Sequence, residues 1–236
     1  MVAPVNNMEE TCSFTFGCNK KDCSEPFCLR KFKLENLYNK ALLTEAQRKH
    51  ITLDIANDPT DLEAFQKLAE ISKGIESFVD NGCNLFIYSS TCGNGKTSWS
   101  IKLLESYMQK IWAKCDLSCH ALFISVPRFL LAIKANITEP NEYAQEILDN
   151  VLDADIVVWD DIAAKIGTEF ELNHLLSLID ARITAGKSNI YTSNVAPAAL
   201  TSAIGDRLAS RVANLSMKIQ FNGVDRRDFF NNLRAD

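Results

Sequence analysis

Residues 84–98 read NLFIYSSTCGNGKTS, a short apolar run followed by a glycine-rich loop. The apolar run is a strand candidate, and residues 97–113 continue with the periodicity of an amphipathic helix. The loop closes with Gly95, Lys96 and Thr97, as phosphate-binding loops do, but Ser90 stands where such loops open with glycine. A glycine turn before a chance lysine would look similar. The strand–loop–helix order favours a nucleotide site.

The chemistry of such a site depends on small residues and on the helix start. Small side chains let backbone N–H groups curl around phosphates, and the helix N-terminus adds the positive end of its dipole. Lys96 would reach the β- and γ-phosphates, and the Thr97 hydroxyl would ligate Mg²⁺. The residues expected to bind ATP are Ser90, Thr91, Cys92, Gly93, Asn94, Gly95, Lys96, Thr97 and Ser98.

Beyond the loop, short apolar runs alternate with helical patterns. Strands are expected at 84–89, 120–126, 155–160, 188–193 and 215–221. Helices are expected after Pro127 and at 139–152, 169–186 and 200–213, the last with a possible break at Gly205. Before the loop, helices are expected at 32–50 and from Pro59 to about residue 80. Strands that are apolar through their middles predict an α/β fold with a parallel sheet flanked by helices on both faces.

Polar side chains follow two of these expected strands. Asp160 and Asp161 end the run DIVVWDD, at the edge where open α/β sheets bind ligands. Asp160 would hold Mg²⁺ through water, and Asp161 would orient or activate the attacking water. Asn194 ends NIYTSN, where it could hold that water, although ordinary turn chemistry explains TSN as well. Arg211, four residues after Arg207, could act as an arginine finger on a neighbouring subunit's nucleotide.

In this order and spacing, the motifs resemble those of the DnaC/DnaI helicase loaders, a family of AAA+ ATPases. The resemblance covers about residues 75–236 and includes the segment GVDRR. It implies a P-loop AAA+ core without a separate lid, with Asn194 as sensor 1, Arg211 as the arginine finger and Arg227 as the sensor 2 arginine. Ser90 in place of glycine and Asp161 in place of glutamate depart from the family pattern, and they bear on the rate of hydrolysis more than on binding.

The N-terminus carries a cysteine cluster with the spacing C-x5-C-x4-C-x4-C. Four thiolates suit tetrahedral Zn²⁺, and a segment this poor in apolar residues would need such a metal cross-link to fold. Loaders of the family carry a small zinc-binding N-terminal domain, which adds to this expectation. Free thiols and an iron–sulfur cluster stay open as alternatives. The expected ligands are Cys12, Cys18, Cys23 and Cys28.

Three segments with different roles are therefore expected. Residues 1–50 would form a cysteine-rich helicase-interaction module, 51–80 a helical linker and 81–236 the AAA+ ATPase core. With 236 residues, 47% of them hydrophobic, and no long apolar run, the chain is expected to be a cytoplasmic protein of a bacterium or a phage-infected host, without membrane contact.

The resemblance implies a function and partners. It predicts an ATPase that binds a hexameric replicative helicase, delivers it onto single-stranded DNA and self-associates through its ATPase interfaces. Arg128, Phe129 and Lys134 lie where the family contacts single-stranded DNA. Two rival functions stay open: a transposition helper ATPase of the IstB type, and an adaptor that binds nucleotide without turnover.

Overall fold

The structure, a computed structural model, describes residues 27–48, 59–164 and 168–226. Its helices and strands follow one another in the order α1 (Leu29–Lys40), α2 (Glu45–Arg48), η1 (Pro59–Asp61), α3 (Leu62–Lys73), α4 (Ile75–Asp80), β1 (Asn84–Tyr88), α5 (Lys96–Ile111), β2 (Ala121–Ser125), α6 (Val126–Asn136), α7 (Glu142–Asn150), β3 (Ile156–Asp160), α8 (Glu169–Thr184), β4 (Ser188–Ser193), α9 (Pro197–Ile204), α10 (Asp206–Asn214) and β5 (Met217–Gln220).

The strands form one five-stranded sheet in the order β2-β3-β4-β1-β5, and every neighbouring pair is parallel. The chain leaves β1, the neighbour of the edge strand β5, for the far edge at β2 and returns through β3 and β4 to the side of β1. Because all strands run the same way, their carboxyl ends lie at one edge of the sheet. The reversal of strand order beside β1 is the position where open α/β sheets bind ligands. The predicted parallel α/β sheet is confirmed.

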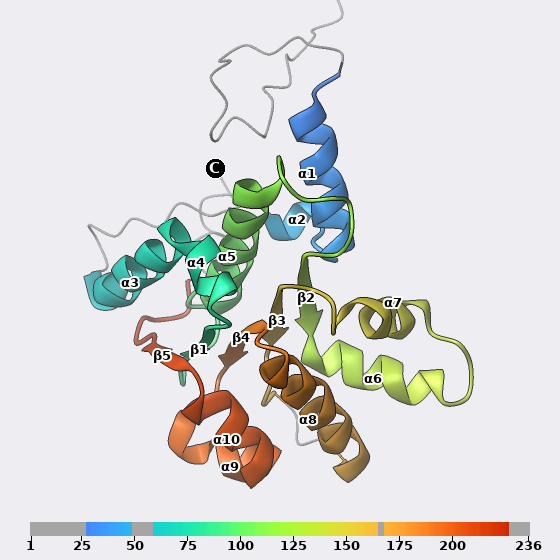
Figure 1. The fold of residues 1–236 in the computed structure, drawn as a ribbon. Coiled ribbons are helices and arrows are strands. Elements are labelled where there is room, and N and C mark those ends of the chain that lie inside the picture. Colours follow the sequence, from blue (N-terminus) through green and yellow to red (C-terminus); the bar gives the residue numbers. More distant parts are fainter. Residues whose placement is uncertain (1–26, 49–58, 165–167, 227–236) are drawn as a thin grey trace, which may run out of the picture.

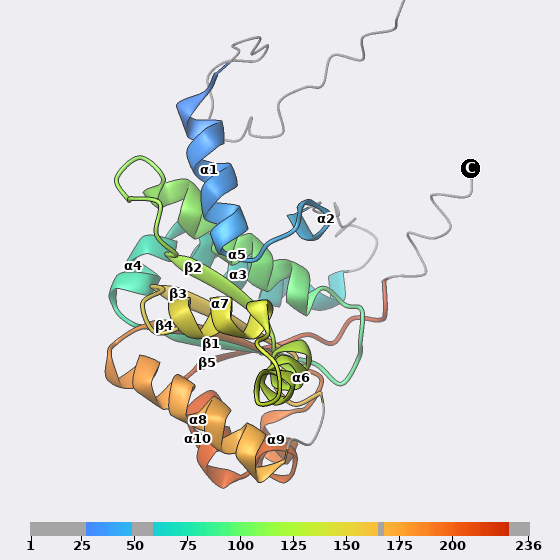
Figure 2. The ribbon, with the colours of Figure 1, turned by 90° about the vertical axis from the view of Figure 1, so that its right-hand side faces the viewer.

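Helices cover both faces of this sheet (Figures 1 and 2). Alternate residues of each strand point to opposite faces, so Leu85 and Ile87 join one hydrophobic cluster while Phe86 joins another. The first cluster packs the sheet against α1, α3, α4 and α5, and the second packs it against α6 to α10. Burial on both faces explains why β1, β2 and β3 are apolar through their middles instead of alternating.

Local backbone geometry corrects two helix predictions and confirms a third. The expected helix from Pro59 to about residue 80 is interrupted at Gly74, which ends α3 and precedes α4. The helix expected at 32–50 stops at Lys40, and Leu42 takes a left-handed φ of 58°. The possible break at Gly205 is confirmed, because this residue has a φ of 78° and separates α9 from α10.

The helices that precede the sheet in sequence belong to its core. Leu34, Leu37 and Tyr38 of α1, together with Phe65 and Leu68 of α3, are almost fully buried in the cluster that contains β1 and α5. The division of roles at residues 50 and 80 stays a prediction, but α1 and α3 stabilise the same domain as the glycine-rich loop. Among the described residues, no helix has both the length and the apolar character needed to span a membrane.

Candidate nucleotide-binding site

The glycine-rich loop, residues 89–95, connects β1 to α5 at the carboxyl edge of the sheet. Gly93 has a φ of 71° and Gly95 a φ of 104°, in the left-handed region that residues with a side chain rarely adopt. Helix α5 begins directly after Gly95. The first N–H groups of a helix have no intrahelical partner and lie at the positive end of its dipole. The local geometry is therefore suited to an anion.

Lys96 folds back over this loop. Its side chain is buried, and Nζ donates to the Thr91 carbonyl at 2.8 Å and to Asn94 Oδ1 at 3.2 Å. Asn94 is itself fully buried and donates to Ser89 Oγ at 2.7 Å. Ser90, Cys92 and Ser98 are exposed around the loop. The ammonium group therefore lies within the curve of the loop, the position from which it could bind phosphate.

Asp160, at the tip of β3, lies next to the start of α5. Thr97 Oγ1 donates to Asp160 Oδ1 at 2.9 Å, and Thr192 Oγ1, from β4, donates to the same oxygen at 2.7 Å. Burial raises the pKa of Asp160, and the nearby carboxylate of Asp161 acts in the same direction, while the bonds from Thr192 and Thr97 partly offset the shift. Hydroxyl and carboxylate oxygens are the ligand types that Mg²⁺ prefers, so Thr97 and Asp160 fit that ion.

Asp161 and Asn194 lie beside this cluster. Asp161 has a left-handed φ of 56°, and its backbone N–H donates to Thr192 Oγ1 at 2.9 Å. Asn194 Nδ2 approaches Asp161 Oδ1 at 3.4 Å. Within the described part of the chain, Asn194 Oδ1 is buried without a hydrogen-bond partner. A buried acceptor without a partner is costly unless a ligand or water supplies a donor. The structure thus brings Lys96, Thr97, Asp160, Asp161 and Asn194 into one place, while their roles in catalysis stay predictions.

The two predicted arginines do not join this group. Arg211, on α10, donates to Asp180 of α8 at 2.5 Å, and both side chains are about two-fifths exposed at 42% and 44%. Its role as an arginine finger requires a second subunit and stays a prediction. Arg227 lies outside the described residues. Its neighbour Arg226 does contact the glycine-rich loop, donating from Nη1 to the Asn94 carbonyl at 3.3 Å. Sequence reasoning missed this contact.

The zinc prediction lies largely outside the described residues. Of the four expected ligands only Cys28 is described, as a free thiol at the residue before α1. No group of three or more His, Cys, Asp or Glu within residues 27–48, 59–164 and 168–226 could hold a metal ion.

One of the residues expected to contact DNA is excluded from that role. Phe129, a residue of α6, is fully buried in the core and cannot stack on a base. The prediction that Phe129 contacts single-stranded DNA is therefore wrong. Arg128 lies over the Tyr143 ring with its Cζ 4.0 Å from the ring centroid. Lys134 forms an ion pair with Glu171 at 3.0 Å. Arg128 and Lys134 remain candidates for phosphate contacts.

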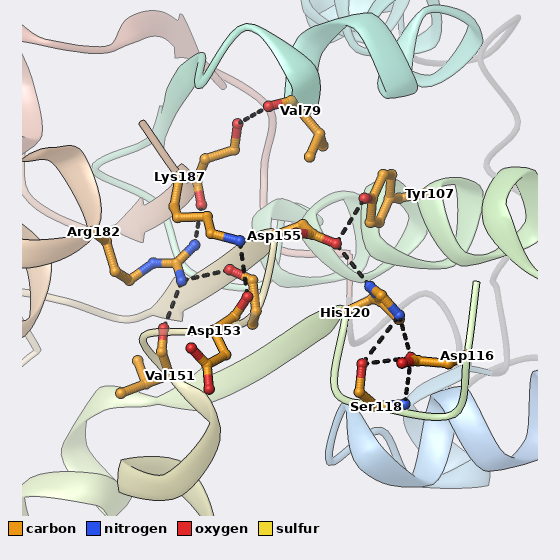
Figure 3. Close-up of polar contacts among 12 residues, drawn as sticks. Val79, Tyr107, Asp116, Ser118, His120, Val151, Asp153, Asp155, Arg182 and Lys187 are labelled. Carbon is orange, nitrogen blue, oxygen red and sulfur yellow. Dashed lines mark hydrogen bonds and ion pairs between the residues drawn. The ribbon is translucent and has the colours of Figure 1, made fainter. Parts of the chain in front are cut away.

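A second polar cluster lies at the opposite, amino edge of the sheet (Figure 3). His120 precedes β2, Asp155 precedes β3 and Lys187 precedes β4. His120 Nδ1 is 2.8 Å from Asp155 Oδ2, its Nε2 is 2.9 Å from Asp116 Oδ1, and Lys187 Nζ donates to Asp155 Oδ1 at 2.9 Å. These contacts join the starts of three strands, which is a structural role. They lie at the far end of the sheet from Lys96 and Asp160.

No protein-family model matches the chain, and no curated protein matches it. Solved structures do match. The DnaC helicase loader aligns with a TM-score of 0.58 and 17% identity over 75% of this chain and 96% of that chain. DnaI aligns with a TM-score of 0.57 and 17% identity over 76% of this chain and 95% of that one. AMPPCP-bound DnaA from Aquifex aeolicus aligns with a TM-score of 0.53 and 19% identity over 80% and 54% of the two chains.

At these identities the likeness concerns the three-dimensional fold. The alignments with those proteins cover three quarters or more of this chain, including the described sheet and helices. The described part of the chain therefore has the AAA+ fold that DnaC and DnaA share.

Proposed function

We propose that this protein is an ATP-dependent helicase loader that binds a hexameric replicative helicase and delivers it onto single-stranded DNA. The observation that supports this most directly is the contact between Thr97 and Asp160, which joins the helix after the glycine-rich loop to the tip of β3 at 2.9 Å. Nucleoside triphosphate hydrolysis requires backbone N–H groups that bind the phosphates and a carboxylate at the metal ion. The structural likeness to the DnaC helicase loader and to DnaI adds the link to helicase loading.

In this proposal the chain's own residues divide the work on ATP. The loop amides and Lys96 bind the phosphates, and Thr97 and Asp160 hold Mg²⁺, which neutralises charge on the phosphate oxygens when bound. Asp161 and Asn194 orient the attacking water. Arg211 would leave its surface pair with Asp180 to complete a neighbouring subunit's site. Solvent screens an exposed pair of this kind, so exchanging it for a nucleotide contact costs little.

The partner-binding part of the proposal concerns the N-terminal segment. The module at residues 1–50 would hold the helicase, with Zn²⁺ on Cys12, Cys18, Cys23 and Cys28, and the core would bind single-stranded DNA. The protein would act in the cytoplasm of a bacterium or a phage-infected host. Because α1 is buried in the core through Leu34 and Leu37, a truncation at residue 50 would damage the ATPase fold. Removing residues 1–26 leaves α1 intact.

The test measures ATP hydrolysis with and without single-stranded DNA for the wild type, Lys96→Ala and Lys110→Ala. Lys110 is an exposed residue near the end of the same helix and serves as the matched control. We expect Lys96→Ala to abolish hydrolysis and Lys110→Ala to retain it. Equal inactivity of the wild type and Lys96→Ala, with helicase binding intact in both, would instead identify a nucleotide-binding adaptor.

A pull-down against the replicative helicase tests the partner. We expect the full chain to retain the helicase and the form lacking residues 1–26 to lose it while keeping ATP binding. Capture of a transposase with DNA-stimulated hydrolysis, and no capture of helicase, would refute the loader function in favour of a transposition helper.

A further inference from the structure

The chain after β5 returns to the glycine-rich loop and binds it from outside. The backbone N–H of Arg226 donates to the Gly93 carbonyl at 3.2 Å, and its side-chain Nη1 donates to the Asn94 carbonyl at 3.3 Å. Asn94 Nδ2 in turn approaches the Gly223 carbonyl at 3.4 Å. Two successive carbonyls of the loop are thereby held by one arginine, 132 residues away in the sequence.

A buried carboxylate holds this returning segment in place. Asp61, at the end of η1, is 1% exposed. Its Oδ1 accepts from the Asn222 N–H at 2.7 Å, and its Oδ2 accepts from the Gly223 N–H at 3.1 Å and from Arg226 Nη2 at 3.4 Å. Breaking one partner of a buried, hydrogen-bonded charge leaves the other uncompensated. The Asp61 carboxylate therefore anchors residues 222–226.

The close fit leaves no space for a side chain at Gly223. A Cβ added there would lie 2.4 Å from Asp61 Oδ2 and 2.9 Å from Arg226 Nη2. The guanidinium of Arg226 also lies over the Phe65 ring of α3, 5.3 Å from its centroid. Planar stacking and a two-pronged donor fork make arginine, rather than lysine, suited to this position.

These contacts bear on how the loop presents its N–H groups. In a loop that curls around phosphates, the N–H groups face the anion and the carbonyls face away. Arg226 fixes two of the outward carbonyls, and Asp61 fixes Arg226. A loop held in its binding conformation before the ligand arrives loses less entropy on binding. The contacts of Asp61 and Arg226 should therefore raise the affinity for nucleotide.

We propose that Asp61 and Arg226 are positioning residues that hold the glycine-rich loop ready for a nucleoside triphosphate, an inference that rests on the proposed ATPase function. Neither residue contacts the reacting atoms; Arg226 acts on the loop carbonyls, and Asp61 acts through Arg226. Loosening the loop raises the KM for ATP and changes kcat little, because Thr97 and Asp160 hold the reacting end through separate contacts.

The experiment compares Asp61→Asn, Arg226→Gln and the double variant with the wild type, measuring Kd for a fluorescent ATP analogue, KM and kcat. Each single variant should raise Kd and KM about tenfold with kcat within about twofold, and the double variant should be no worse than the more severe single variant, since the two act as a unit. Arg48→Gln is the matched control, because its guanidinium also lies over an aromatic ring, that of Tyr38 at 4.7 Å, away from the loop.

The outcomes separate this inference from the function on which it rests. If the wild type fails to bind the ATP analogue, the proposed function fails. If the wild type binds, Lys96→Ala does not, and the Asp61 and Arg226 variants bind as the wild type does, only the positioning role is refuted. Independent, multiplying effects of the two substitutions would also refute it, because Arg226 would then act without Asp61. Urea unfolding of each variant identifies a loss of affinity that reflects loss of the fold.

Discussion

Replacing Asp160 with asparagine separates the stability of the site from its chemistry. Asparagine keeps the Oδ1 acceptor that receives hydroxyl hydrogen bonds from Thr97 at 2.9 Å and Thr192 at 2.7 Å. Each such bond contributes about 1 kcal/mol net. Burial raises the pKa of Asp160, so ionising this carboxyl costs more free energy in the folded chain than in the unfolded chain, and the substitution removes that extra cost. We expect the free energy of unfolding to change by less than about 1 kcal/mol.

Hydrolysis should respond very differently. A metal ion that neutralises phosphate charge supplies several kcal/mol, so losing the carboxylate proposed to hold that ion should lower kcat by at least about 100-fold. Asp160→Ala is the matched control, because it also removes the acceptor for both hydroxyls and should lower the free energy of unfolding by about 2 kcal/mol. Urea unfolding and a phosphate-release assay give the two numbers. An Asp160→Asn variant that hydrolyses ATP at the wild-type rate, or that unfolds as readily as Asp160→Ala, would refute the reasoning.

Three further substitutions test other parts of the molecule. Thr192→Val removes the hydroxyl that bridges Asp160 and the Asp161 backbone, so kcat should fall about tenfold. Thr192→Ser keeps a hydroxyl and should recover the rate. An unchanged kcat in Thr192→Val would refute a role for this hydroxyl. Arg182 is fully buried and donates to the carbonyls of Val151, Ala154 and Ser188. Arg182→Met should therefore cost at least about 3 kcal/mol in urea unfolding. Burial acts to raise the pKa of Asp155, but hydrogen bonds from His120 and Lys187 outweigh burial, and the pKa is lowered. The ionised carboxylate therefore stabilises the fold above about pH 4, and this stabilisation is lost on acidification. The stability difference between wild type and Asp155→Asn should accordingly shrink as the pH falls, and a constant difference would contradict this.

Local patterns predicted the parts of this protein that depend on near neighbours in the chain. The strand, loop and helix around Lys96 could be identified because apolar runs, glycine and a following 3.6-residue period are all local signals. Their placement at the carboxyl edge followed from the rule that ligands of parallel sheets bind there. Asp160 and Asp161 were recognised for the same reason. Phe129 was misjudged, because half-exposed and buried positions on a helix look alike in sequence.

By itself the sequence determined the class of fold, since strands that are apolar through their middles must be covered on both faces. It also predicted the phosphate site, since a glycine-rich turn before a helix presents several free N–H groups. The tertiary structure alone decided which partners complete the site. The hydrogen bonds from Thr97 and Thr192 to Asp160, and from Arg226 to Asn94 and Asp61, join residues between 32 and 165 positions apart. Such contacts arise from the strand order β2-β3-β4-β1-β5 and from the path of the chain after β5, which depend on the packing of the whole domain and leave no local pattern.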